Sequence, residues 1–150
     1  MATYYPKNAL DTKRIAKDLW QEIQKARIVF LNGPLGAGKT FFVKQLGETL
    51  GIKEEIISPS FQLIKIYPIP GLSKQLVHTD LFRLDIKSPN DFLELFEIIE
   101  EEDNIVLIEW GEKIASLIKP KMIIEFEFSG INKHKINIPK CKTPGVLHFG

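Results

Sequence analysis

The sequence lacks several features that define whole classes of proteins. Cys141 is the one cysteine in 150 residues, which excludes an internal disulfide and fits a reducing compartment. No apolar run approaches the roughly 18 residues of a membrane-spanning helix, and no cleavable signal segment is recognisable. We therefore expect a cytoplasmic protein without a membrane partner.

An excess of charge of one sign is also lacking. Lysines and arginines number 20 against 19 aspartates and glutamates, so a net charge of +1 gives no overall attraction to nucleic acid. Few of the basic residues are arginines, and none follows Arg83. A hydrophobic content of 44% is ordinary for one globular domain. We place that domain at residues 1–139 and expect residues 140–150 to be a flexible C-terminal tail.

What the sequence does contain is a phosphate-binding loop. Residues Gly33-Pro34-Leu35-Gly36-Ala37-Gly38-Lys39-Thr40 fit the pattern G-x-x-x-x-G-K-[ST]. An apolar, β-branched stretch at 27–32 precedes the loop, and apolar residues recur at helical spacing from Phe42 to Leu50. In this order of strand, loop and helix, glycines let backbone N–H groups surround a phosphate at a helix N-terminus. We expect Lys39 to reach the β- and γ-phosphates and Thr40 to bind Mg²⁺.

The other periodic segments predict an α/β protein with a mixed sheet, because two hairpins interrupt its parallel core. Helical spacing indicates one helix capped by Asn8 or Asp11 and another that begins at Ser88, with Leu93 on its buried side. A third, short helix is expected at 113–118.

Alternating and apolar segments predict the strands of this sheet. Besides the strand before the loop, they are expected at 61–67, 75–80, 105–108, 122–128 and 134–138. The alternation at 122–128 is typical of an edge strand. Residues 1–7 show no such pattern and are expected to be a loose start.

A phosphate-binding loop also needs an acid for Mg²⁺ and a group that positions the attacking nucleophile. Such acids lie at the carboxyl ends of buried strands, and Asp80 and Glu109 each follow an apolar segment. Glu109 has the more apolar strand and is the better candidate, although either acid could instead cap a helix or pair with a lysine. His78 has the pattern of a core histidine. Ser60 lies on a turn, where it either senses the γ-phosphate or caps the turn.

Four motifs together resemble those of the TsaE family, also called YjeE, the bacterial ATPases of tRNA threonylcarbamoyladenosine synthesis. They are the phosphate-binding loop, Ser58-Pro59-Ser60-Phe61, His78-Thr79-Asp80-Leu81-Phe82-Arg83 and Ile108-Glu109-Trp110-Gly111-Glu112-Lys113. They follow one another with family-like spacing across residues 8–138. Phe82 stands where the family commonly has a tyrosine, which removes a hydroxyl group.

The resemblance implies a P-loop NTPase-like three-layer α/β fold with a mixed, partly antiparallel central sheet. It also implies weak, Mg²⁺-dependent hydrolysis of ATP and action together with TsaB and TsaD, with tRNA as an indirect partner only. It implies a catalytic set of Lys39, Asp80 and Glu109, and Mg²⁺ held by Thr40 and Glu109 with Asp80 close by. It also implies a switch-like loop around Ser58 and Ser60. The implied nucleotide-binding residues are Thr12, Gly33, Leu35, Gly36, Ala37, Gly38, Lys39, Thr40, Phe41 and Trp110.

Two other functions are compatible with the loop. A small-molecule kinase would usually carry an arginine-bearing lid, which the chain after Arg83 cannot supply. A nucleotide-gated binding module without required turnover would keep Lys39 and Thr40 but would not need Glu109. A GTPase is disfavoured because Asn132-Lys133-His134-Lys135 has a lysine where the guanine-reading N-K-x-D pattern needs an aspartate.

Overall fold

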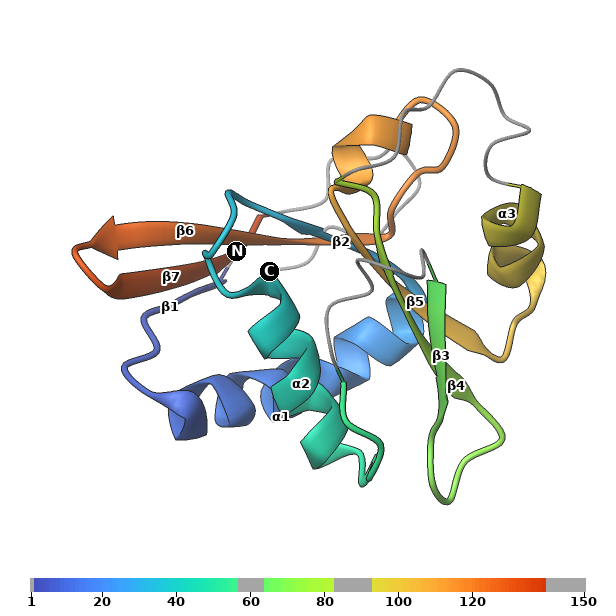
Figure 1. Ribbon diagram of the computed structural model, residues 1–150, viewed down its shortest axis with the longest axis horizontal. Helices are drawn as coiled ribbons and strands as arrows, with labels where there is room; N and C mark the ends of the chain where they lie inside the picture. Colours follow the sequence, from blue (N-terminus) through green and yellow to red (C-terminus); the bar gives the residue numbers. More distant parts are fainter. Residues whose placement is uncertain (1, 57–63, 83–92, 140–150) are drawn as a thin grey trace.

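The computed structural model describes residues 2–56, 64–82 and 93–139, and it arranges them as a sheet with helices on both faces (Figure 1). Within these residues the sheet has seven strands in the order β1-β7-β6-β2-β5-β4-β3. The elements along the chain are β1 (Ala2–Tyr4), α1 (Ala9–Ala26), β2 (Ile28–Asn32), α2 (Lys39–Thr49), β3 (Ile64–Pro68), β4 (Gln75–Asp80), α3 (Leu93–Glu100), β5 (Asn104–Glu109), the 3-10 helix η2 (Gly111–Ile114), β6 (Met122–Gly130) and β7 (Lys133–Ile138).

The centre of the sheet is parallel and its flanks are antiparallel. β6, β2, β5 and β4 are parallel neighbours, whereas β3 pairs antiparallel with β4, and β7 pairs antiparallel with β6 and β1. All six residues of β5 are buried, as expected for a parallel strand that is covered on both faces. The predicted three-layer α/β fold with a mixed sheet is therefore confirmed.

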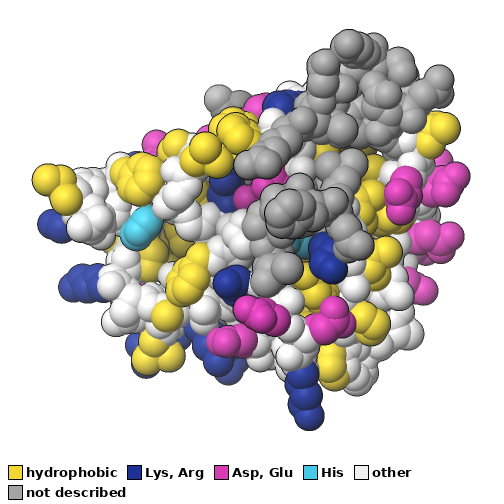
Figure 2. Space-filling model, in the orientation of Figure 1, with side chains coloured by type: hydrophobic (Ala, Val, Ile, Leu, Met, Phe, Trp, Pro, Cys, Tyr) yellow, Lys and Arg dark blue, Asp and Glu magenta, His cyan; other side chains and the backbone are white. Residues whose placement is uncertain are grey.

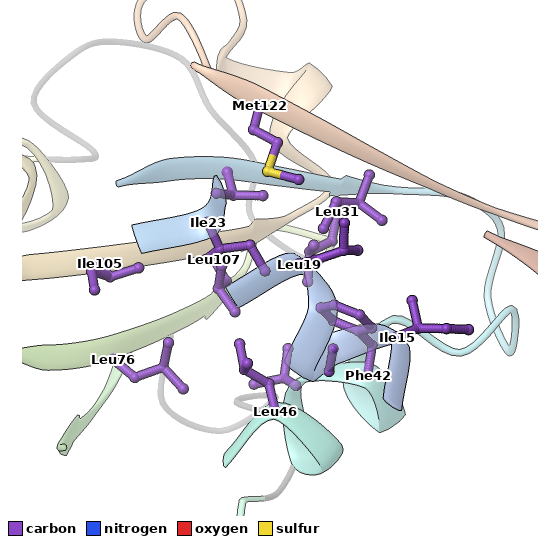
Figure 3. Close-up of a cluster of buried hydrophobic side chains, with 14 of the residues drawn as sticks. Ile15, Leu19, Ile23, Leu31, Phe42, Leu46, Leu76, Ile105, Leu107 and Met122 are labelled. Carbon is purple, nitrogen blue, oxygen red and sulfur yellow. The ribbon is translucent and has the colours of Figure 1, made fainter. Parts of the chain in front are cut away.

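One layer consists of α1 and α2. The side chain of Asn8 caps α1, because its Oδ1 accepts a hydrogen bond of 2.9 Å from the backbone N–H of Asp11. Ile15, Leu19 and Ile23 then line one side of the helix at three- and four-residue spacing, and all three are buried. They pack with side chains of α2 and of the sheet in the larger hydrophobic cluster (Figure 3).

The opposite layer consists of α3 and η2, and here two predictions are wrong. Leu93 was expected to be buried but is 56% exposed, while Leu95 and Ile98 face the sheet. Leu93 lies on the side of the helix that carries the exposed acids Glu94, Glu97 and Glu100, opposite the side of Leu95 and Ile98. The helix predicted at 113–118 is instead a 3-10 helix at Gly111–Ile114, and its first residue, Gly111, packs directly on Phe30 of β2.

Two predictions about the sheet are also wrong. Residues 2–4 are not a loose start but form β1, in which Ala2 pairs with Ile138 and Tyr4 with Ile136. β6 is not an edge strand, since it lies between β2 and β7. Its alternation arises because one face packs on the larger cluster while the other face is only partly covered. Ser88, the first residues of the strand predicted at 61–67 and the tail at 140–150 lie outside the described residues.

The contact between Gly111 and Phe30 generates a test of the packing. A Cβ at Gly111 would lie 2.4 Å from Cγ of Phe30, so Gly111→Ala must displace the ring or the backbone. We expect the free energy of unfolding in urea to fall by about 1–3 kcal/mol. Gly130→Ala is the control, because a Cβ there would meet its nearest atom, in Lys133, at an ordinary 3.4 Å. Equal losses in the two variants would contradict this account of η2.

Candidate nucleotide-binding site

The site lies at the edge of the sheet where the central parallel strands end. Asp80 is the last residue of β4 and Glu109 the last residue of β5, and their Cα atoms are partners in the ladder. Leu31 of β2 pairs with Glu109 on the other side, so the loop after β2 begins beside this carboxylate. Ligands of open α/β sheets commonly bind at this edge.

The backbone of the loop requires its glycines. Gly33, Gly36 and Gly38 have φ angles of 149°, 78° and 109°, in the region that side chains rarely adopt. A Cβ on Gly33 would also lie 2.3 Å from the carbonyl oxygen of Phe126 in β6. Gly38 is the N-cap of α2 and provides no side-chain cap, so the first N–H groups of the helix face the loop as donors for an anion.

Lys39 is held inside the site. Its side chain is 4% exposed, its Nζ donates a hydrogen bond of 2.5 Å to the carbonyl oxygen of Gly33, and the same atom lies 4.1 Å from the centre of the Trp110 ring. Burial lowers the pKa of this ammonium, and the carboxylates of Glu109, Asp80 and Glu112 oppose that effect. The cation therefore sits in a partly dry site where its attraction to phosphate is weakly screened.

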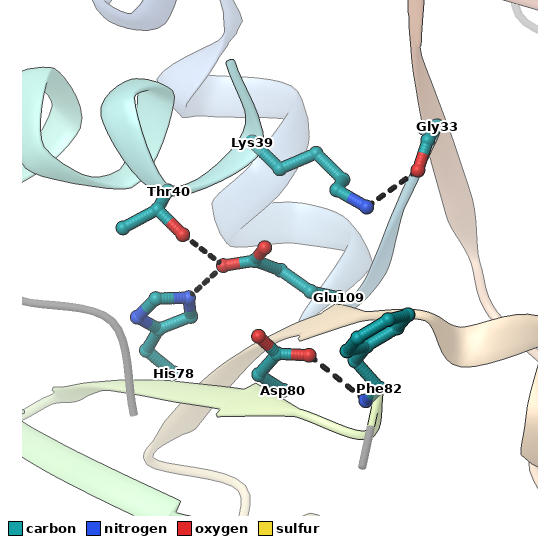
Figure 4. Close-up of polar contacts among 7 residues, drawn as sticks. All are labelled: Gly33, Lys39, Thr40, His78, Asp80, Phe82 and Glu109. Carbon is teal, nitrogen blue, oxygen red and sulfur yellow. Dashed lines mark hydrogen bonds and ion pairs between the residues drawn. The ribbon is translucent and has the colours of Figure 1, made fainter. Parts of the chain in front are cut away.

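A hydroxyl group and a carboxylate meet opposite this lysine (Figure 4). Oγ1 of Thr40 donates a hydrogen bond of 2.8 Å to Oε2 of Glu109, whose side chain is almost fully buried. The ring of His78 contacts the same oxygen through Nε2 at 2.5 Å. Asp80 lies beside this cluster, and its Oδ1 accepts a hydrogen bond of 2.9 Å from the backbone N–H of Phe82.

These oxygens suit Mg²⁺ better than a transition metal. Within the part of the chain that is described, no group of three or more His, Cys, Asp or Glu side chains could hold a metal ion. Mg²⁺ typically takes one or two carboxylates from the protein and completes its shell with phosphate oxygens and water. Thr40 and Glu109, with Asp80 nearby, fit that requirement.

Trp110 reaches Lys39 because of an unusual backbone. Its φ and ψ angles of 61° and 37° are left-handed, which is uncommon for a bulky residue. The ring packs against Phe82 with centroids 4.9 Å apart. Lys113 stabilises this packing, because its Nζ donates a hydrogen bond of 2.5 Å to the carbonyl oxygen of Phe82. The strained residue thus closes one side of the site.

A pocket of about 440 Å³ lies on the other side of the loop, a size that suits a nucleoside. Thr12 of α1 and Phe41 of α2 line it, as do Gly36, Ala37 and Gly38. Sequence reasoning missed its other polar side chains, which belong to Lys7, Asn8, Asn132 and His134. The one signal was the tetrapeptide at 132–135, which resembles a nucleotide-reading motif only in part.

The sequence-predicted residues divide into three groups. Lys39, Thr40 and Glu109 come together, with Asp80 and Trp110 beside them. Thr12 and Phe41 line the neighbouring pocket, whereas the side chain of Leu35 is 62% exposed. Ser58 and Ser60, proposed as a switch-like loop, lie outside the described residues.

The glycine loop, the lysine and the mixed sheet define a P-loop nucleotide-binding protein. The family model for the "Threonylcarbamoyl adenosine biosynthesis protein TsaE" matches residues 6–138. The chain belongs to the TsaE family, which takes part in tRNA threonylcarbamoyladenosine biosynthesis.

Individual relatives agree with this assignment. The chain is 39% identical over 132 residues to the tRNA threonylcarbamoyladenosine biosynthesis protein TsaE of Rickettsia typhi, covering 87% of this chain and 89% of that protein. It is 40% identical over 114 residues to the protein of the same name from Treponema pallidum, covering 73% and 78% of the two chains. The crystal structure of Bacillus subtilus YdiB superposes with a TM-score of 0.67 at 26% identity, covering 91% of this chain and 83% of that one. None of the helices in the described part of the chain has the length and apolar character needed to cross a membrane.

The position of Lys39 generates a test of phosphate binding. We expect Lys39→Ala to weaken the affinity for ATP by about 10- to 100-fold, because a buried charge-assisted contact to phosphate is lost. Isothermal titration calorimetry measures the affinity, and circular dichroism should show an unchanged fold. Lys44→Ala, on the same helix and only partly buried, is the matched control and should bind ATP as the unaltered protein does. Wild-type affinity in Lys39→Ala would contradict the assignment of the loop.

Proposed function

We propose that this protein is a Mg²⁺-dependent ATPase that hydrolyses ATP weakly alone and acts with TsaB and TsaD in tRNA N6-threonylcarbamoyladenosine modification. The observation that carries the proposal is the hydrogen bond between Thr40 and Glu109. It joins the first turn of the helix after the phosphate-binding loop to the end of the neighbouring strand. A binding module would need the loop and Lys39, but it would not need a buried acid at this place.

The site has separate regions for the parts of Mg-ATP. The pocket beside Thr12 and Phe41 suits the nucleoside, and the N–H groups between Gly33 and Lys39 suit the phosphate chain. Thr40 and Glu109 would hold Mg²⁺ with Asp80 close to it. When bound, Mg²⁺ neutralises charge that develops on the phosphate oxygens during hydrolysis.

The residues of the chain have distinct tasks in this proposal. Lys39 binds the β- and γ-phosphates after its ammonium leaves the carbonyl oxygen of Gly33. Glu109 receives hydrogen bonds from Thr40 and His78 at one oxygen, Oε2, and Oε1 takes part in neither. A carboxylate fixed in this way is suited to contact the metal or to orient a water molecule. Trp110 shields Lys39 from solvent and strengthens its charge interactions.

The surroundings of the loop support a protein partner. Leu35 of the loop and Phe128 of β6 are 62% and 50% exposed. They lie close together, because a Cβ on Gly36, the residue after Leu35, would lie 3.8 Å from the Phe128 ring. Exposed apolar side chains that lie together at a functional site are typical of interaction surfaces.

A second surface is acidic. Figure 2 shows acidic side chains gathered over α3, where Glu94, Glu97 and Glu100 are exposed. Such charges can steer a basic partner at low salt. We keep the expected cytoplasmic location as part of the proposal.

Turnover should depend on the carboxylate of Glu109. Glu109→Gln keeps the shape of the side chain but removes its charge, so we expect ATP binding to remain while kcat falls at least about 100-fold. Calorimetry and a phosphate-release assay separate the two effects. Glu22→Gln makes the same chemical change at an exposed acid of α1 and should leave kcat within about threefold of the original value. A much larger loss in Asp80→Asn than in Glu109→Gln would exchange the roles of the two acids.

Partner proteins should complete the site. We expect ATP hydrolysis to rise at least about tenfold when TsaB and TsaD are added, since activators commonly supply missing contacts to the γ-phosphate. Depletion of the protein should also lower threonylcarbamoyladenosine in tRNA. Support of the modification by a non-hydrolysable ATP analogue would favour the binding module. Rapid phosphorylation of a metabolite without partners would favour the kinase.

A further inference from the structure

Among the described residues, the side chain of His78 makes one polar contact. Its side chain is fully buried in β4, and Nε2 lies 2.5 Å from Oε2 of Glu109. Nδ1 is also buried and has no hydrogen-bond partner among the described residues. A buried nitrogen without a hydrogen-bond partner lowers the stability of the folded protein. A side chain that served packing alone would therefore be apolar at this place.

The pairing of β4 with β5 places His78 beside Glu109. His78 pairs with Leu107 of β5, and Glu109 follows Leu107 by two residues. Because side chains two residues apart lie on one face of a strand, His78 and Glu109 point to the same face of the sheet. This is the face covered by α2, from which Thr40 reaches the same oxygen. The carboxylate is therefore held from two sides by donors on different elements (Figure 4).

We propose that His78 is a positioning residue for Glu109. Its Nε2–H donates to Oε2 and holds the carboxylate against the hydroxyl group of Thr40, ready for Mg²⁺, and this role rests on the proposed ATPase function. Outer contacts of this kind orient metal-binding side chains, and their loss typically weakens metal binding or activity by about 10- to 100-fold. A residue that served packing alone would show its effect in stability instead.

Three variants separate the hydrogen bond from packing. In His78→Gln the amide nitrogen can take the place of Nε2 and donate to Glu109, whereas the shorter side chain of His78→Asn places its amide where Nδ1 stands. His78→Leu fills the space without any donor. We expect kcat for ATP to fall about 10- to 100-fold in His78→Leu and His78→Asn, with KM nearly unchanged, and less than about threefold in His78→Gln.

Two further measurements do not depend on turnover. Calorimetry with ATP, with and without Mg²⁺, should show that Mg²⁺ increases the affinity less in His78→Leu than in the original protein or His78→Gln. The thermal midpoint of His78→Leu should exceed that of His78→Asn although both lack the donor to Glu109, because the amide of asparagine would lie where Nδ1 has no partner among the described residues.

The outcomes distinguish the two proposals. A loss of activity that follows the loss of thermal stability across all three variants would overturn the role of His78, as would equal activity of His78→Gln and His78→Asn. Full activity of His78→Leu in a protein whose hydrolysis is normal would remove the positioning role alone. A wild-type protein that hydrolyses no ATP even with TsaB and TsaD would instead remove the proposed function itself. Should His78→Leu fail to fold, the comparison of His78→Gln with His78→Asn still decides.

Discussion

The site depends on a carboxylate that is buried at the end of a parallel strand. Removing a charge from water is costly unless donors and opposite charge surround it. Glu109 receives hydrogen bonds at Oε2 from Thr40 and His78, and Lys39 lies near enough for this carboxylate to raise the pKa of its ammonium. These contacts tie β5 to β4 and to the first turn of α2, so the same interaction orders the site and joins the elements that form it.

The phosphate-binding loop depends on a second constraint, the close approach of β6. The carbonyl oxygen of Phe126 lies where a Cβ of Gly33 would be, so only glycine allows β6 to pair beside β2 at this point. The position of β6 also brings the β6–β7 turn over the loop, where Asn132 and His134 line the pocket with Thr12 of α1. Membership of the TsaE family gives the cellular process, and these contacts indicate which residues bind and which orient.

The local pattern of apolar residues predicted the helices and strands whose side chains are buried in the same way along their length. The apolar run at 105–108 and the strand predicted at 75–80 correspond to β5 and β4, and Asn8 caps α1 as its position indicated. Pattern failed where burial is decided by distant segments. Leu93 is exposed because it shares the solvent side of α3 with Glu94, Glu97 and Glu100. Residues 2–4 form a strand only because β7 offers an unpaired edge.

The sequence by itself determined the phosphate-binding loop, the order of most elements and the choice of Asp80 and Glu109, because each depends on residues close together in the chain. Only the tertiary structure decided that Glu109, rather than Asp80, contacts Thr40, since this depends on how β5 aligns with β2 and α2. It also decided that His78 lies behind the carboxylate and that Trp110 covers Lys39. Both contacts join segments about 30 or more residues apart in the chain. The left-handed backbone at Trp110 depends on tertiary packing, which the local spacing of residues does not indicate.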